Sequence, residues 1–244
     1  EHIDTLREGK SYIQGINDSE IEAYIDKKLY VFESYDQLKE ADAILICVPT
    51  PLLESKEPDL SYIQSSMTQI LRVMKKNTLV VLESTTYPGT TRELLMNRIC
   101  MEKDWIVGED FYVCYSPERV DPGNKTYYVS NTPKVIGGVT KECLDVGVTL
   151  YEQFIEKVVP VKTTEIAEMS KLLENTFRCV NIALMNEMTI MAERLGIDIW
   201  ETIKAASTKP FGFVPFFPGP GVGGHCIPID PMYLSWKAKQ YNYF

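Results

Sequence analysis

Short, continuous apolar runs alternate with stretches of helical character through the first two thirds of the chain. Runs of this kind suit strands that are covered on both faces, as in parallel α/β sheets. We expect strands at residues 29–32, 43–48, 78–82, 111–115, 134–138 and 157–161, and helices at 34–41, 59–75, 90–100 and 140–154. This alternation predicts an α/β fold built on a doubly wound, Rossmann-like sheet.

The pattern changes at about Thr164. Neither Pro nor Gly occurs in residues 165–195, and apolar side chains recur there at steps of three and four. This periodicity predicts one long helix of about 30 residues. Shorter helices are expected near 198–206 and 231–240, with a loop at 210–220 before the last one. We therefore expect a sheet domain over residues 1–162 and an all-helical domain over residues 163–244, joined by the long helix.

Composition narrows the classes of function. The chain has 244 residues, 45% of them hydrophobic, which is enough for a substantial core, and its net charge is −9. An acidic chain is a poor candidate for general binding to nucleic acid or to an anionic membrane surface. Six cysteines without a Cys-x-x-Cys pair, and only two histidines, make a metal site unexpected. Scattered cysteines, no signal peptide and no long apolar run indicate a reduced, cytoplasmic protein.

The most informative segment is 219–231, Gly-Pro-Gly-Val-Gly-Gly-His-Cys-Ile-Pro-Ile-Asp-Pro. Its glycines allow a sharp turn and a close approach to a ligand. Cys226 is therefore a candidate covalent nucleophile, against the alternative of a small buried hydrophobic residue. Asp230 is a candidate polar partner of the thiol, the N-cap of the next helix, or both at once. His225 is interpreted as structural.

Lys171 and Asn175 lie one turn apart on the long helix, so their side chains share a face. An ammonium and an amide group that converge on one oxygen atom can stabilise an oxyanion. Arg178, Asn181 and Asn186 continue this polar face. The alternative is an ordinary solvated helix surface.

Polar residues also follow the expected strands. Thr50, Thr85 and Glu118 all come after apolar runs. Ligands of doubly wound sheets bind beyond the carboxyl ends of the strands. These residues are therefore candidates for a binding site, although loops are polar by default.

Five blocks of the chain resemble, in the same order, the signature blocks of the UDP-glucose/GDP-mannose dehydrogenase family. They are Val48-Pro-Thr-Pro, Glu83-Ser-Thr-Thr-Tyr-Pro-Gly-Thr, Tyr115-Ser-Pro-Glu-Arg, Lys171-Leu-Leu-Glu-Asn, and the block from Thr208 to Pro231. The segment that begins at Asp230 looks most like the branch that oxidises UDP-N-acetylglucosamine. Two departures from the relatives that oxidise UDP-glucose favour a 2-acetamido sugar: Ile229 replaces a Lys, and Pro122 replaces a second Glu.

The resemblance also implies that parts of the family pattern are missing. The family opens with a strand and a Gly-x-Gly-x-x-Gly turn that holds the dinucleotide pyrophosphate, and this chain has no such motif. The family's C-terminal nucleotide-sugar domain would follow Phe244. We therefore expect a chain truncated at both ends, with little or no activity by itself.

For function, the resemblance implies two successive oxidations of a UDP-sugar C6 alcohol to the carboxylate, with NAD as cofactor, for surface-polysaccharide precursors. Residues 1–162 would bind NAD, and residues 163–244 would form a central domain and a homodimer. The implied catalytic residues are Cys226, Lys171, Asn175, Glu118, Asp230 and Thr85. The implied cofactor-binding residues are Val48, Pro49, Thr50, Ser84 and Thr85. The implied substrate-binding residues are Glu118, Arg119, Lys171, Asn175, Phe216, Phe217, Gly219 and Gly223.

Other readings stay open. The sugar could be UDP-N-acetylmannosamine or UDP-glucose. A single-step dehydrogenase of the 6-phosphogluconate type would use a long helix with a Lys/Asn pair but no cysteine. An inactive binding or dimerisation module is the non-enzymatic alternative.

Overall fold

The computed structural model describes residues 2–13, 16–121, 124–224 and 226–243. The chain forms two compact units. The sheet unit comprises Glu1–Pro49, Ser61–Ser84 and Gly89–Ala167, and the helical unit comprises Thr50–Leu60, Thr85–Pro88 and Glu168–Phe244. The helical unit therefore takes two short segments from the sheet-forming part of the sequence.

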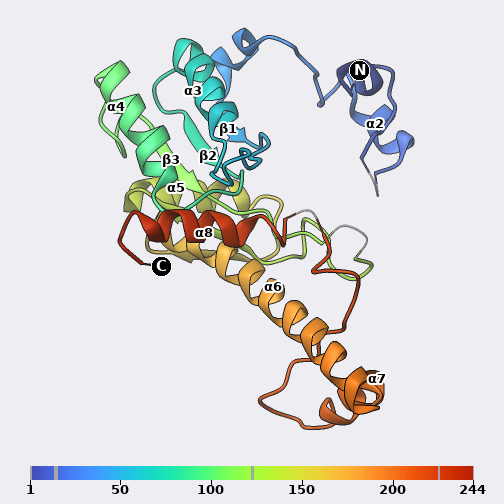
Figure 1. Ribbon diagram of the computed structural model, residues 1–244. Helices are drawn as coiled ribbons and strands as arrows, with labels where there is room; N and C mark the ends of the chain where they lie inside the picture. The colour runs from blue at the N-terminus through green and yellow to red at the C-terminus, as the bar shows by residue number, and fades with distance from the viewer. Residues whose placement is uncertain (1, 14–15, 122–123, 225, 244) are drawn as a thin grey trace. The chain divides into compact units, whose positions relative to one another are not determined.

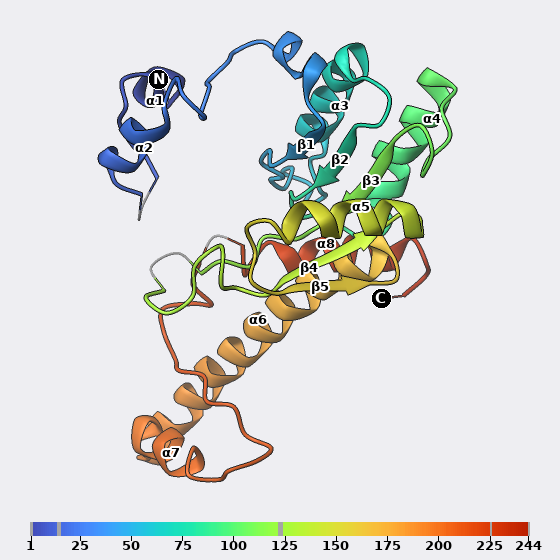
Figure 2. The same cartoon turned by 180° about the vertical axis from the view of Figure 1, so that it is seen from behind.

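The sheet unit is built on five strands, which Figure 2 labels, and Figure 1 shows the same unit from the opposite side. They are β1 (Ala43–Ile46), β2 (Leu79–Leu82), β3 (Tyr112–Tyr115), β4 (Lys134–Gly138) and β5 (Val158–Val161), in the order β1-β2-β3-β4-β5. Strands β1, β2 and β3 are parallel, β4 runs antiparallel to β3, and β5 is parallel to β4. The expected Rossmann-like α/β sheet is confirmed, and it is a mixed sheet.

The reversal at β4 has a local cause. A parallel neighbour needs a long crossover, usually a helix. The described part of the connection from Ser116 to Pro133 contains no helix, and the chain returns antiparallel. Tyr115 pairs with Gly137 in this register. The end of β4 therefore pairs with the end of β3, and the start of β4 extends past the carboxyl end of β3.

The sheet unit also contains helices. The described helices of the unit are α1 (His2–Arg7), α2 (Asp18–Tyr24), the 3-10 helix η1 (Tyr35–Glu40), α3 (Ser61–Val73), the π-helix η2 (Thr91–Met96), α4 (Asn97–Lys103) and α5 (Lys141–Tyr151). Helix α5 packs on β3 and β4 (Figure 2), while α3 packs against η1, η2 and α4. The Thr140 hydroxyl starts α5 by accepting a hydrogen bond from the Cys143 amide at 3.2 Å.

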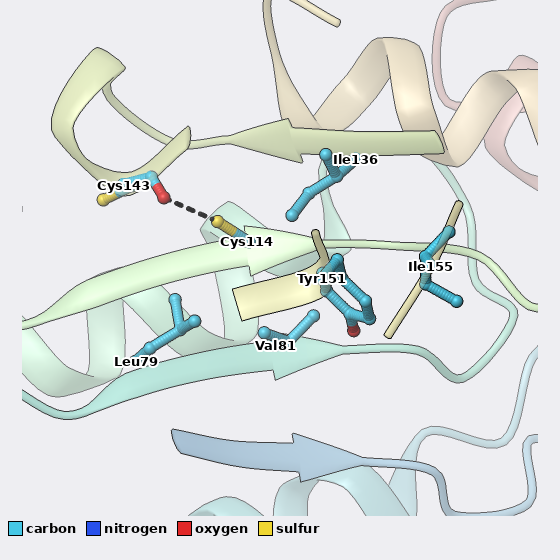
Figure 3. Packing of buried hydrophobic residues seen from close by; sticks show 7 residues of the cluster. All are labelled: Leu79, Val81, Cys114, Ile136, Cys143, Tyr151 and Ile155. Carbon is cyan, nitrogen blue, oxygen red and sulfur yellow. Dashed lines mark hydrogen bonds between the residues drawn. The ribbon is translucent and has the colours of Figure 1, made fainter. Parts of the chain in front are cut away.

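The core under α5 explains the apolar runs. Leu79, Val81, Cys114, Ile136, Cys143, Tyr151 and Ile155 form one buried cluster (Figure 3). The Cys114 thiol donates to the Cys143 carbonyl at 3.0 Å. Val80 and Leu82 are also buried. Because alternate residues of a strand face opposite sides, β2 is covered on both faces, as its uninterrupted apolar sequence predicted.

Some local predictions were wrong. The expected strand at 29–32 does not form, and Leu29 makes only an isolated bridge with Ile25. In the described chain no strand pairs with this run, and Tyr30 and Phe32 are more than half exposed. The expected helices at 34–41 and 90–100 form as a 3-10 helix and as a π-helix that continues into α4.

The helical unit is organised around α6 (Thr164–Leu195), whose residues up to Ala167 count with the sheet unit. The expected long helix is confirmed, with 32 residues. Gly196, with a φ of 72°, follows it and allows the chain to leave the helix. Helices α7 (Ile199–Ala206) and α8 (Asp230–Lys239) follow (Figure 1). Tyr87, Leu172 and Tyr233 form the buried cluster that holds α8.

Candidate active site

The helical unit joins two of the predicted site segments. Asn175 on α6 donates from Nδ2 to Oδ2 of Asp230 on α8 at 2.5 Å. Asn175 is 7% exposed and Asp230 is 2% exposed. Burial raises the pKa of the Asp230 carboxyl, while the Asn175 hydrogen bond and the Lys171 charge oppose that rise. Lys171, Asn175 and Asp230 therefore interact as one group.

Asp230 lies inside helix α8 and not at its cap. The N-cap of α8 is Ile229, without a side-chain cap, and Asp230 lies in the first helical turn. The alternative prediction that Asp230 is an N-cap was wrong. Its carboxylate is directed to Asn175 instead.

Cys226 lies one turn before α8. Its carbonyl oxygen accepts hydrogen bonds from the amides of Ile229 and Asp230, both at 3.0 Å. The residue is exposed and its thiol is free. Gly223 and Gly224 have φ values of 69° and 70°, in the left-handed region that favours glycine. The glycines therefore form the turn that leads to an accessible thiol; His225 lies outside the described residues.

Helix α8 is anchored to segments that precede it by more than a hundred residues. The Tyr233 hydroxyl donates to the Thr50 carbonyl at 2.5 Å, and burial raises the pKa of Tyr233 to about 12. The Trp236 ring lies 4.8 Å from the ring of Tyr87. Thr50 and Thr85 are themselves half-buried in these segments. Tyr233 could not be predicted as part of the site, because its partner is a backbone carbonyl.

The aromatic loop before Cys226 lies along α6 and α7. Phe216 contacts Phe177 edge to face at 5.5 Å between centroids, and Phe217 stacks on Trp200 at 6.2 Å. Asn186 accepts from the Gly219 amide at 2.9 Å and donates to the Gly221 carbonyl at 3.2 Å. Gly219 and Gly223 are exposed. One side chain from the polar face of α6 thus holds the glycine loop.

The sheet unit places the other predicted residues at the carboxyl edge of β1, β2 and β3. Ser84 donates to the Val48 carbonyl at 2.7 Å, so the ends of β1 and β2 are tied together. Val48 is half-buried and Pro49 exposed. Glu118 is exposed and accepts at Oε1 from the amides of Arg119 and Val120, at 2.7 and 2.6 Å. Arg119 donates to the Pro133 carbonyl at 2.7 Å; Pro122 lies outside the described residues.

A buried ionic group at this edge was not predicted. The Lys134 ammonium lies 3.2 Å from Glu83 and 3.7 Å from Glu118. The Tyr151 hydroxyl donates to Glu83, and burial, followed by the Glu83 charge, raises the pKa of Tyr151. Lys134 is only 8% exposed. The sequence feature that could have indicated this group is a lysine at the start of an apolar run. It does not identify the partners of the lysine, because they are distant in sequence.

Two further observations bear on the class of site. Among the described residues, no group of three or more His, Cys, Asp or Glu side chains is arranged to hold a metal ion. No helix in the described part of the chain has both the length and the apolar character needed to cross a membrane.

The chain is similar to several known proteins. The chain is 41% identical over 207 residues to the UDP-N-acetyl-D-glucosamine 6-dehydrogenase of Pseudomonas aeruginosa, covering 84% of this chain and 49% of that protein. It is 41% identical over 206 residues to protein CapL of Staphylococcus aureus, covering 84% and 48%. A solved structure of UDP-D-ManNAc dehydrogenase from Pyrococcus horikoshii matches with a TM-score of 0.89 and 37% identity, covering 97% of this chain and 56% of that one.

The chain spans about half the length of the curated relatives it matches. Residues 1–155 match the NAD binding domain of the UDP-glucose/GDP-mannose dehydrogenase family, which confirms the expected NAD-binding domain. Residues 165–244 match the central domain of the same family. With two family domains matched in order along nearly all of its length, the chain belongs to the UDP-glucose/GDP-mannose dehydrogenase family.

Proposed function

We propose that the full-length protein oxidises the C6 alcohol of a UDP-sugar to the carboxylate, in an NAD-dependent, four-electron reaction. The observation that carries the proposal is the buried Asn175–Asp230 contact, which joins the Lys171/Asn175 pair to the helix that follows the Cys226 turn. These are the residue types that covalent trapping of an aldehyde requires: a nucleophile, oxyanion donors and a nearby carboxyl.

The chemistry assigns each residue a role. Once the alcohol has become an aldehyde, the Cys226 sulfur forms a bond to the aldehyde carbon and gives a thiohemiacetal. Oxidation of this adduct gives a thioester. Water then adds to the thioester carbon, the C–S bond breaks, and the thiolate leaves. Lys171 and Asn175 stabilise the oxyanion at the tetrahedral stages. Glu118 accepts the proton of the attacking water molecule. Thr85 and Asp230 position that water molecule.

The residues at the strand ends fit the cofactor. NAD supplies the hydride acceptor for both oxidations. Three parallel strands end together, and the Ser84–Val48 hydrogen bond fixes the two loops that begin there, which is the place where doubly wound sheets bind dinucleotides. We assign Val48, Pro49, Thr50, Ser84 and Thr85 to the nicotinamide end of the cofactor.

UDP-N-acetylglucosamine is the substrate we favour. The Pseudomonas aeruginosa relative is named for that sugar and the Pyrococcus horikoshii structure for UDP-D-ManNAc. Both names contain a 2-acetamido sugar, which agrees with Ile229 in place of the lysine expected for UDP-glucose. The segment 216–223, with Arg119, would line the sugar site. The product would serve surface-polysaccharide synthesis. We place the protein in the reducing cytoplasm, because cysteines stay reduced there and all six cysteines of this chain are free.

The deciding measurement is the amount of NADH released for each UDP-N-acetylglucosamine consumed by the full-length protein. About two molecules per sugar are expected from covalent trapping by Cys226. Cys226→Ser should abolish uronate formation, while Cys100→Ser on α4 should leave it unchanged. About one NADH per sugar would indicate a single-step dehydrogenase, and uronate formation by the Cys226→Ser variant at the unchanged rate would refute the role of the thiol.

We further propose that α6 forms a homodimer interface. Its apolar stripe is unusually open to solvent: Leu173 is 60% exposed, Val180 59% and Leu184 49%. A contiguous apolar patch of this kind marks an interaction surface. Light scattering should give twice the monomer mass for the full-length protein, and Val180→Glu should reduce it to the monomer. Val180→Glu without an effect on mass would contradict the assignment.

A further inference from the structure

The sheet unit holds a charged cluster whose role the proposed reaction leaves open. Lys134, Glu83 and Tyr151 are all largely buried, and each contacts another member. Burying an ammonium group is expensive unless it is paired and hydrogen-bonded. A buried lysine at this position therefore calls for a structural or functional explanation.

The pairing of β3 with β4 explains how Glu118 comes to lie near Lys134. Cys114 pairs with Gly138 and Tyr115 with Gly137 in the antiparallel ladder. The chain leaves β3 beside the first part of β4: the Ser116 hydroxyl donates to the Val135 carbonyl at 2.8 Å, and the Glu118 carboxylate lies 3.7 Å from the Lys134 ammonium. The pair is thus a product of the reversal at β4.

The two oxygens of Glu118 are held differently. Oε1 accepts from the amides of Arg119 and Val120. Oε2 lies 3.7 Å from the Lys134 ammonium. A carboxylate offers roughly four lone-pair sites, so these three contacts fix its orientation and leave room for a water molecule. The side chain of Glu118 is 51% exposed, so water can reach it.

The Lys134 side chain is itself restrained by contacts with other residues. Its ammonium lies 3.2 Å from Glu83, 3.5 Å from the Pro117 carbonyl oxygen and 5.3 Å from the centroid of the Tyr151 ring. Tyr151 keeps its proton because its pKa is raised, so it donates to Glu83 throughout the physiological range. The ammonium therefore has little freedom to move away from Glu118.

We propose that Lys134 is a positioning residue that holds the Glu118 carboxylate in the orientation needed to activate water, and that Glu83 and Tyr151 hold Lys134. This inference rests on the proposed function, in which Glu118 takes the proton from the water that hydrolyses the thioester. It predicts that loss of Lys134 slows hydrolysis and spares the steps that form the thioester.

The test uses the full-length protein with NAD and UDP-N-acetylglucosamine. Intact-mass spectrometry follows the sugar adduct on Cys226, and stopped-flow absorbance follows NADH. In Lys134→Met we expect the adduct to accumulate and the hydrolysis rate to fall by ~10²-fold, the size that a displacement of about 1 Å can produce. Lys134→Arg should recover most of the rate. The surface variant Lys75→Met, whose ammonium pairs with the exposed Asp42 at 3.0 Å, is the matched control.

A double-mutant cycle separates positioning from other effects. Lys134→Met should add nothing to the defect of Glu118→Gln if it acts through that carboxylate. Additive losses would overturn the proposal, as would an unchanged hydrolysis rate in Lys134→Met. If that variant does not fold, Glu83→Gln keeps the lysine but loosens it, and should give a smaller defect of the same kind.

A crystal structure of Lys134→Met gives an answer that does not depend on activity. We expect the Glu118 carboxylate to leave its position while the backbone of residues 116–120 stays in place. An unmoved carboxylate would overturn the positioning role. A moved carboxylate together with no adduct in any variant would instead count against the thioester reaction, which keeps the two failures distinct.

Discussion

The buried Asn175–Asp230 hydrogen bond allows a sharp test through the substitution Asn175→Ala. A hydrogen bond to a charged group contributes ~1.5–3 kcal/mol, and its loss leaves the Asp230 carboxylate buried without this donor. We expect the free energy of unfolding to fall by that amount at neutral pH. Asn181→Ala is the matched control, because Asn181 on the same helix donates to the Phe177 carbonyl of its own helix, at 2.8 Å.

The pH dependence of the loss follows from the pKa of Asp230. Because burial raises this pKa in the folded state, the protonated form favours folding. That contribution is complete below the unfolded-state pKa of ~3.9 and is lost as the pH rises through the folded-state value. Asn175→Ala removes an interaction that lowers the folded-state pKa. The destabilisation caused by Asn175→Ala, relative to the wild type, should therefore be larger at pH values above the folded-state pKa and smaller below pH ~4.

Urea titration followed by tryptophan fluorescence measures this effect. A Trp105→Phe, Trp200→Phe background leaves Trp236 on α8 as the reporter, so the signal comes from the helical unit. In a further Asp230→Asn background, Asn175→Ala should cost less and lose its dependence on pH. An equal loss at acid and neutral pH, or a loss no larger than that of Asn181→Ala, would refute the reasoning.

Three further substitutions test other parts of the structure. Gly137→Ala would place a Cβ 2.2 Å from the Thr163 carbonyl oxygen, so we expect at least ~1–3 kcal/mol of destabilisation in chemical denaturation. Lys134→Met should lower stability by ~3–5 kcal/mol because it strands the Glu83 charge, and adding Glu83→Leu should recover much of the loss in the same assay. Asp198→Ala removes the α7 cap, which accepts from the amides of Trp200 and Glu201, and should cost ~1 kcal/mol and speed amide exchange in the first turn of that helix.

The elements predicted best are those that local sequence determines. Helix α6 could be predicted because 31 residues without Pro or Gly also carry a regular apolar period. Strand β2 could be predicted because four consecutive buried residues leave no polar face. The run at 29–32 has similar local character, but a strand needs a neighbour to pair with, and local sequence does not provide one. The direction of β4 was missed for the same reason, since it depends on how the chain returns.

The candidate site divides in the same way. Lys171 and Asn175 are related by helix spacing, and Cys226 and Asp230 by one turn, so each pair could be predicted from the sequence. The contact between the two pairs depends on how α6 packs against α8, which local sequence does not determine. The motif resemblance suggested it, and the structure supplies it through the Asn175–Asp230 hydrogen bond.

The cluster around Lys134 shows what a sequence pattern cannot provide. Glu83 follows β2, Glu118 follows β3, Lys134 opens β4, and Tyr151 ends α5, so four separate elements each contribute one side chain. Both clusters nevertheless follow one physical rule: a buried carboxylate accepts a hydrogen bond from a neutral donor, Asn175 in one and Tyr151 in the other, and a lysine acts on it electrostatically. A neutral donor holds the carboxylate without neutralising it. In each unit a neutral donor therefore holds a buried carboxylate in a defined orientation beside a lysine, an arrangement that a plain apolar core would not need.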